Sequence, residues 1–243
     1  MAAWAAHPDD TEISCGGTIA SLAKGGRKVA IVDLTRGEMG TRGTAKTREQ
    51  EAVRAAEILG VAERVNLGLP DTGLANTREH QLAVIRELRR LRPAVCLINA
   101  PHDRHPDHGA AAKLLLDAFF YSGLAKIKTR DAHGREQDPW RPSHVMHYMQ
   151  DRKFEPDFIV DVTGTQPIKE KAILAFATQM NVEDPGDEPE TYISSTTFFE
   201  GLRARARHYG HMGGCEYGEP FLYASGTPMF RDLNVFLDNS VTR

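Results

Sequence analysis

The sequence has few of the features that mark secreted, membrane-spanning or nucleic-acid-binding proteins. Its three cysteines, Cys15, Cys96 and Cys215, are odd in number and far apart, so no disulfide framework is expected and a reducing compartment is favoured. No apolar run approaches the roughly 18 residues of a membrane span. Basic residues are spread along a chain of net charge -3, whereas nucleic-acid binding needs a concentrated basic face. We therefore expect a cytoplasmic protein with no membrane or nucleic-acid partner.

The remaining composition is that of an ordinary globular protein. The 243 residues are 41% hydrophobic and 26% charged, and a chain of this length buries a sizeable core without disulfides. We predict one domain over residues 1–243, with a C-terminal extension from about residue 181. Residues 183–190 are acidic and rich in proline, which is typical of a surface loop.

Short apolar runs alternate with longer amphipathic segments in the first half of the chain. The runs predict strands over 1–6, 28–34, 65–69 and 94–100, and helices over 18–24, 47–59, 77–91 and 109–120. In the second half the predicted strands are 143–150 and 157–162, and the predicted helices are 167–180 and 197–209. The alternation predicts an α/β fold with a mostly parallel sheet and helices on both faces.

A first polar cluster, His7-Pro8-Asp9-Asp10 followed by Glu12, comes directly after the first predicted strand. Ligands of parallel α/β sheets bind at the carboxyl ends of the strands, so the cluster lies where a site is expected. Crowded ionisable side chains are unfavourable unless a cation compensates them, and histidine with aspartate is a usual ligand pair for zinc. The alternative is a polar loop whose aspartates cap the next helix.

A second polar cluster follows the predicted strand 94–100 and contains His102, His105, Asp107 and His108. Pro106 stiffens this segment, and Asp107 is placed to hydrogen-bond an imidazole and fix its tautomer. These histidines are helix caps or surface groups in the alternative interpretation. Two clusters after two strands of one sheet favour a shared metal site. Two histidines and one aspartate leave a coordination position for water, as in catalytic zinc sites.

The two motifs together resemble a known family. Ala6-His7-Pro8-Asp9-Asp10-Thr11-Glu12 with His105-Pro106-Asp107-His108 is similar to the LmbE-like (PIG-L) zinc deacetylases. The segments 33–44 and 66–71 resemble the branch that deacetylates N-acetylglucosaminyl-malate in the bacillithiol pathway. The likeness extends to about residue 180. It implies a Rossmann-like α/β fold, a Zn²⁺ cofactor, an N-acetylglucosamine conjugate as substrate, and a homo-oligomer.

The resemblance also implies roles for individual positions. Asp9 matches the general base, and Glu12 matches a supporting acidic residue. His105 matches the imidazole that stabilises the tetrahedral intermediate, with Asp107 orienting it. The positions that match the zinc ligands are His7, Asp10 and His108.

A malate-bearing substrate is dianionic, and guanidinium groups pair with carboxylates bidentately. Arg36, Arg42 and Arg48 lie near the loop after the second predicted strand, and Arg141 lies in Trp140-Arg141-Pro142. We predict Arg42, Arg48 and Arg141 as substrate-binding residues; the alternative is that they are solvated surface arginines.

Two other functions stay open. The sugar conjugate could be an inositol glycoside or a chitooligosaccharide. The chain could also be a metal-binding module without catalysis, although pure binding requires neither Asp9 nor His105.

Overall fold

The computed structural model describes residues 1–180 and 189–227. Within them the strands form one seven-stranded sheet in the order β3-β2-β1-β4-β5-β7-β6. Neighbouring strands from β3 to β5 are parallel, and β7 is antiparallel to both of its neighbours. The predicted mostly parallel α/β fold is confirmed. The strands are β1 (Ala2–Ala5), β2 (Ala30–Thr35), β3 (Glu63–Leu69), β4 (Val95–Ile98), β5 (His144–Tyr148), β6 (Phe158–Asp161) and β7 (Gly218–Tyr223).

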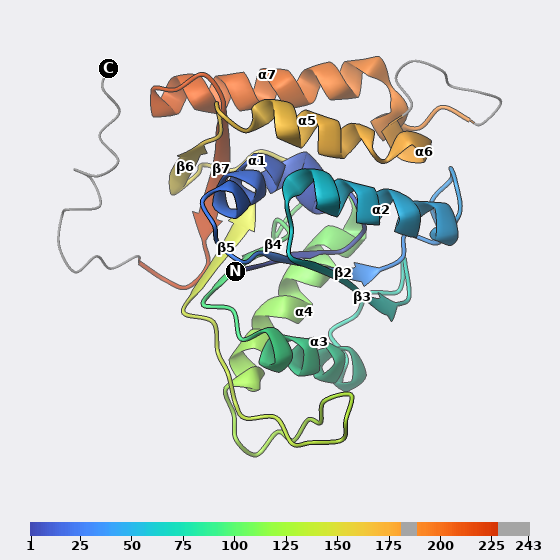
Figure 1. Cartoon of the computed structure of the whole chain (residues 1–243), viewed down its shortest axis with the longest axis vertical. Helices are drawn as coiled ribbons and strands as arrows, with labels where there is room; N and C mark the ends of the chain where they lie inside the picture. Colours follow the sequence, from blue (N-terminus) through green and yellow to red (C-terminus); the bar gives the residue numbers. More distant parts are fainter. Residues whose placement is uncertain (181–188, 228–243) are drawn as a thin grey trace.

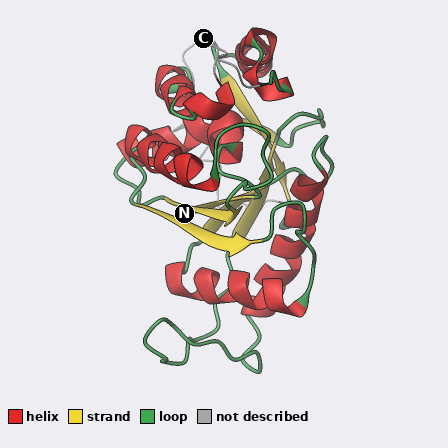
Figure 2. Cartoon of the chain, turned by 90° about the vertical axis from the view of Figure 1, so that its right-hand side faces the viewer, coloured by secondary structure: helices red, strands yellow, loops and turns green. Residues whose placement is uncertain are grey.

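Helices cover both faces of this sheet (Figures 1 and 2). One face is covered by α3 (Arg78–Leu91) and α4 (Pro106–Ser122). The other face is covered by α1 (Asp10–Lys24), α2 (Ala45–Leu59), α5 (Gln166–Leu174) and α7 (Thr196–Gly213). Two short elements, α6 (Ala177–Met180) and η1 (Tyr192–Ser194), lie between α5 and α7 in the chain. No helix in the described ranges is long and apolar enough to cross a membrane.

The central strands are buried on both sides, which explains their continuous apolar runs. Every residue of β1 and β2 is buried. Trp4 faces the α3 and α4 layer, where its ring lies 5.3 Å from that of Phe119. Its neighbour Ala3 and the paired Ile31 face the α1 and α5 layer. The buried strands therefore fix the positions at which the polar loops leave the sheet.

Several elements differ from the sequence-based predictions, and the helix predicted over 167–180 is divided into α5 and α6. Helix α1 begins at Asp10 rather than at residue 18, and its backbone is broken at Cys15. Helix α4 begins at Pro106 because proline suits the first helical position, with His105 as the N-cap. Strand β7 was missed because its sequence contains Gly218, Glu219 and Pro220, which are uncommon in strands. The predicted acidic loop 183–190 lies largely outside the described residues.

Candidate active site

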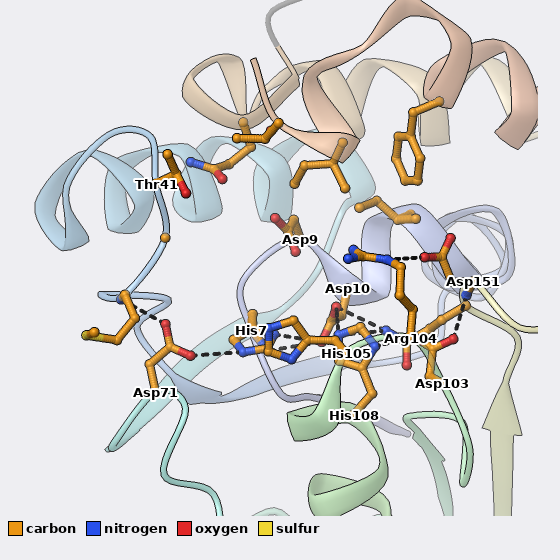
Figure 3. Close-up of a pocket in the computed structure, with 18 of the residues that line it drawn as sticks. His7, Asp9, Asp10, Thr41, Asp71, Asp103, Arg104, His105, His108 and Asp151 are labelled. Carbon is orange, nitrogen blue, oxygen red and sulfur yellow. Dashed lines mark hydrogen bonds and ion pairs between the residues drawn. The ribbon is translucent and has the colours of Figure 1, made fainter. Parts of the chain in front are cut away.

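The two polar clusters meet at the centre of the sheet. The chain runs outward from β1 through β2 and β3, then returns to the other side of β1 as β4. Such a switch point leaves a crevice at the carboxyl ends of the two central strands. His7 follows β1, whereas His105 and His108 follow β4. All three line a cavity of about 220 Å³ (Figure 3).

The carboxylate of Asp10 lies at the bottom of this cavity and is held from several sides. Its Oδ2 accepts hydrogen bonds from the backbone N–H of His7 and from Asn99 Nδ2, each at 3.0 Å. Its Oδ1 accepts from Gln150 Nε2 at 3.0 Å and lies 3.1 Å from His108 Nε2. Burial raises the pKa of Asp10, but the charges and hydrogen bonds of His108 and His7 together hold it well below its usual value. Asp10 is therefore an ionised carboxylate whose oxygens are held in fixed positions, as a metal ligand requires.

His7 presents one ring nitrogen to Asp10 and the other to two carboxylates. Its Nδ1 lies 3.7 Å from Asp10 Oδ2. Its Nε2 lies 3.1 Å from Asp71 Oδ1 and 3.4 Å from Asp107 Oδ2. Burial lowers the pKa of His7, but hydrogen bonds to Asp107 and Asp71 raise it to about 10. The carboxylates fix the ring with Nδ1 directed toward Asp10.

His108 is held in the same manner by a different carboxylate. Its Nδ1 lies 2.5 Å from Asp103 Oδ2, so its Nε2 faces Asp10. Asp103 is itself fixed because its Oδ1 accepts the backbone N–H groups of Asp151 and Arg152. A carboxylate behind each imidazole is the usual outer shell of a histidine that binds a metal.

The residues present fit a divalent metal ion. Donor atoms of His7, His105 and His108 lie within 4.8 Å of one another, as do donors of His7, Asp71 and Asp107. Asp10 contacts both His7 and His108 from the floor of the cavity. Imidazole nitrogens with a carboxylate oxygen form a donor set that zinc accepts.

Asp107 does not orient His105, contrary to the expectation from the sequence. Its carboxylate accepts the backbone N–H of Thr72 at 2.8 Å and approaches His7 instead. The backbone N–H of Asp107 donates to His105 Nδ1 at 3.2 Å, because His105 is the N-cap of α4. Neutral His105 therefore carries its proton on Nε2.

Asp9 is buried against the cavity and is held in an unusual backbone conformation. Its φ of 116° is in the left-handed region, which is strained for a residue other than glycine. Its side chain makes no capping hydrogen bond to α1, and Figure 3 shows it above the histidines. Burial raises the pKa of Asp9 to about 7, although the charge of Arg48 lowers it. A strained, buried carboxylate with such a pKa suits proton transfer at neutral pH.

The predicted substrate arginines lie in different places. Arg48 is only 6% exposed and lines the cavity. Its guanidinium packs directly against the backbone of Gly37, in the loop after β2. The contact is so close that a Cβ atom added to Gly37 would lie only 2.3 Å from Arg48 Nη1. Arg42 is buried, and its carbonyl accepts a hydrogen bond from Gln179 at 2.8 Å. Arg36 is exposed and lies against Gly68.

Arg141 is not brought to the cavity, contrary to the expectation. It precedes β5, so it lies at the amino end of a parallel strand, at the opposite edge of the sheet. Its Nη2 donates to the carbonyl of Phe120, and its guanidinium covers the Phe120 ring at 4.3 Å. Arg141 therefore packs at the end of α4.

Sequence reasoning missed several residues of the cavity. Asp71 follows β3, and Asn99 and Asp103 follow β4, so strand-end position was a usable signal for all three. Gln150 follows β5 and gave no chemical signal. Arg205 lies in α7, where its guanidinium donates to the backbone carbonyls of Gln150 and Ile13. Glu12, predicted to be a supporting acidic residue, does not line the cavity; its carboxylate lies 2.6 Å from Arg64 Nη1.

The fold and the donor set define a class: Rossmann-like α/β proteins with a histidine- and aspartate-lined metal-type site at the switch point. The family model described as "PIG-L: GlcNAc-PI de-N-acetylase" matches residues 3–119. A diacetylchitobiose deacetylase from Thermococcus kodakarensis is 32% identical, over 90% of this chain and 81% of the relative. The chain belongs to the PIG-L family.

Solved structures are similar along nearly the whole chain. The conserved protein TT1542 from Thermus thermophilus is 37% identical, with a TM-score of 0.81 over 95% of this chain and 96% of its own. An N,N'-diacetylchitobiose deacetylase from Pyrococcus horikoshii is 28% identical, with a TM-score of 0.79 over 93% and 83%. The similarity therefore includes the second half of the chain, which contributes Gln150 and Arg205.

Proposed function

We propose that this chain is a zinc-dependent amidohydrolase that removes the acetyl group from an N-acetylglucosamine conjugate. The observation that carries the proposal is the buried carboxylate of Asp9 beside the donors of His7, Asp10 and His108 in one cavity. Family membership supports it, as do the names of similar proteins that deacetylate diacetylchitobiose.

The proposed zinc ligands are His7 Nδ1, one oxygen of Asp10 and His108 Nε2. Zinc bound by three protein groups activates a water molecule and polarises the acetamide carbonyl. The imidazoles must be neutral to bind it. Asp71 and Asp103 each hold the outer ring nitrogen of one histidine, which fixes the ring orientation and directs the other nitrogen toward the proposed metal position.

Asp9 is the proposed general base. It takes a proton from the attacking water while the water oxygen bonds to the acetamide carbon. The proton-bearing Nε2 of His105 donates to the oxygen on which negative charge develops. The carbon–nitrogen bond then breaks, and the amine leaves with a proton returned by Asp9, which gives acetate and a free amino sugar. A carboxylate with a pKa near 7 can both accept and return a proton at neutral pH.

The proposed conjugate is N-acetylglucosaminyl-malate. Arg48 supports a negatively charged substrate, because it lines the cavity and its positive charge acts on groups in it: that charge opposes the rise that burial causes in the pKa of Asp9. Arg104 also lines the cavity, with its Nε 2.5 Å from Asp151. A neutral chitooligosaccharide is the second candidate, because the named relatives act on diacetylchitobiose.

Amine release by purified, zinc-loaded protein tests both candidates. The substrates are N-acetylglucosaminyl-malate, diacetylchitobiose and N-acetylglucosamine. We expect release from the malate conjugate with a clear preference over the neutral sugars. A preference for diacetylchitobiose would keep the deacetylase chemistry and reject the malate assignment. No release from any of the three would reject the deacetylase itself.

A further inference from the structure

A second hollow lies beside the catalytic cavity, along α7. It has a volume of about 500 Å³ and lies between α7 and the segment that follows β5. We refer to it as the α7 groove. The residues of its lining that matter here are Asp151, Lys153, Phe198, Gly201, Arg205 and His208.

The α7 groove is continuous with the catalytic cavity. Asp151, Phe198 and Arg205 line both hollows, and Figure 3 shows Asp151 beside Arg104 at the rim of the cavity. A substrate whose acetamido group lies over the histidines can therefore extend past Arg205 into the groove. The groove therefore offers space for the part of the conjugate that is attached to the sugar.

The charges that face the groove are mainly positive. Lys153 is exposed along it, and Arg205 lines it. Arg205 donates to two backbone carbonyls, and no carboxylate of the described residues forms an ion pair with it. Asp151 is the acidic group among the described lining residues. Its charge is already engaged, because Arg104 Nε lies 2.5 Å from Oδ2 and the Tyr192 hydroxyl donates to Oδ1 at 2.9 Å.

We propose that the α7 groove is the subsite for a negatively charged aglycone, with Lys153 as a specificity-determining residue. The inference rests on the proposed function, because it places the sugar of the same conjugate over the histidines. A carboxylate in the groove would meet the exposed ammonium of Lys153 beside the guanidinium of Arg205, whereas a neutral sugar would not neutralise the Lys153 charge. The groove thus selects the conjugate that the cavity deacetylates.

Gly201 gives a direct way to close the groove. It lies on α7 at the groove, and apart from its chain neighbours and the backbone of its own helix no described atom lies within 4 Å of a Cβ placed there. A side chain at this position therefore enters open space without displacing the fold. Gly201→Phe should fill the groove, and Gly201→Ala is the matched control, because alanine keeps the groove open and favours the helix.

The measurement is the Kd of each variant for N-acetylglucosaminyl-malate and for N-acetylglucosamine, by calorimetry on the full chain carrying Asp9→Asn, so that neither ligand is hydrolysed during the titration. We expect Gly201→Phe to weaken binding of the malate conjugate by about tenfold or more. The same variant should leave binding of N-acetylglucosamine unchanged, and Gly201→Ala should alter neither Kd. If Gly201→Phe weakened the binding of both ligands equally, or the binding of neither, the proposal would be overturned.

Lys153→Met tests the charge separately from the shape. Loss of a charge-assisted hydrogen bond should raise the Kd for the malate conjugate by about tenfold. It should also reduce the dependence of that Kd on salt, since exposed charges are screened. If the Kd for the malate conjugate and its dependence on salt were both unchanged, the α7 groove would not be a subsite for a negatively charged aglycone. Because binding is measured without turnover, this result is distinct from a failure of the deacetylase assay, which would reject the proposed function.

Discussion

The ammonium of Lys169 lies 2.6 Å from the carboxylate of Glu219 inside the break in helix α1. Glu219 also accepts the backbone N–H groups of Gly17 and Thr18, at 2.9 and 2.8 Å. Lys169 donates to the carbonyl of Ser14 at 3.3 Å. The carboxylate therefore caps the second half of the helix and the ammonium caps the first. A residue of β7 thus fixes the helix that begins at Asp10, one of the proposed metal ligands.

Removal of either partner should destabilise the protein strongly. Glu219→Gln or Lys169→Met leaves one charge buried without its partner, which costs about 3–5 kcal/mol. The pair Lys169→Met with Glu219→Gln should cost less than the sum of the two single changes. Denaturant unfolding of the four proteins measures this coupling.

Lys113→Met is the matched control, because Lys113 pairs with Asp117 on the surface of α4. An exposed pair of this kind contributes at most about 1 kcal/mol. Strictly additive effects of Lys169 and Glu219 would contradict the account of a coupled buried pair.

Asp9→Asn tests the proposed base. The amide has nearly the same shape but cannot accept the proton, so the turnover rate should fall by about 10²- to 10⁴-fold. Zinc content should stay near that of the unchanged protein, because Asp9 is not a proposed ligand. Kinetics together with metal analysis check both points. Near-normal turnover with zinc bound would show that another group is the base.

Asp103→Asn tests the support behind His108. Loss of this carboxylate should weaken metal affinity by about 10- to 100-fold. Asp151→Asn is the control, because the Asp151 side chain pairs with Arg104 and Tyr192 rather than with a histidine. Competition with a chelator gives the two affinities. Equal affinities in the two variants would contradict the role assigned to Asp103.

Arg48→Ala and Arg141→Ala should behave differently. Arg48 lines the cavity, so its loss should raise the KM for an anionic conjugate by about tenfold or more. Arg141 packs on Phe120 at the other end of α4, so its loss should leave KM unchanged. Steady-state kinetics with N-acetylglucosaminyl-malate compare them. A raised KM in Arg141→Ala alone would favour the assignment made from sequence.

The central fold could be predicted from the sequence because its strands are buried on both faces, and such strands have continuous apolar sequences. The sequence also located His7 and His108, because the carboxyl ends of parallel strands share one edge of the sheet. These inferences need only the periodicity of the chain and the chemistry of the loops. They hold without knowledge of how distant segments pack.

The remaining features depend on contacts between segments far apart in the sequence. The role of Glu219 as a helix cap could not be predicted, because its hydrogen-bond partners in α1 lie about 200 residues earlier in the sequence. Gln150 and Arg205 carry no motif, and only the packing of β5 and α7 against the cavity gives them a role. Arg141 was misassigned because a residue near a strand can lie at either end of it, and this one lies at the amino end.

The central claim is tested most directly by amine release from N-acetylglucosaminyl-malate as zinc is returned to chelator-treated protein. We predict that activity rises in proportion to bound zinc and stops rising at one ion per chain. The same titration of His108→Ala should give little bound zinc and little activity. Stoichiometric zinc without amine release from this conjugate, diacetylchitobiose or N-acetylglucosamine would contradict the account.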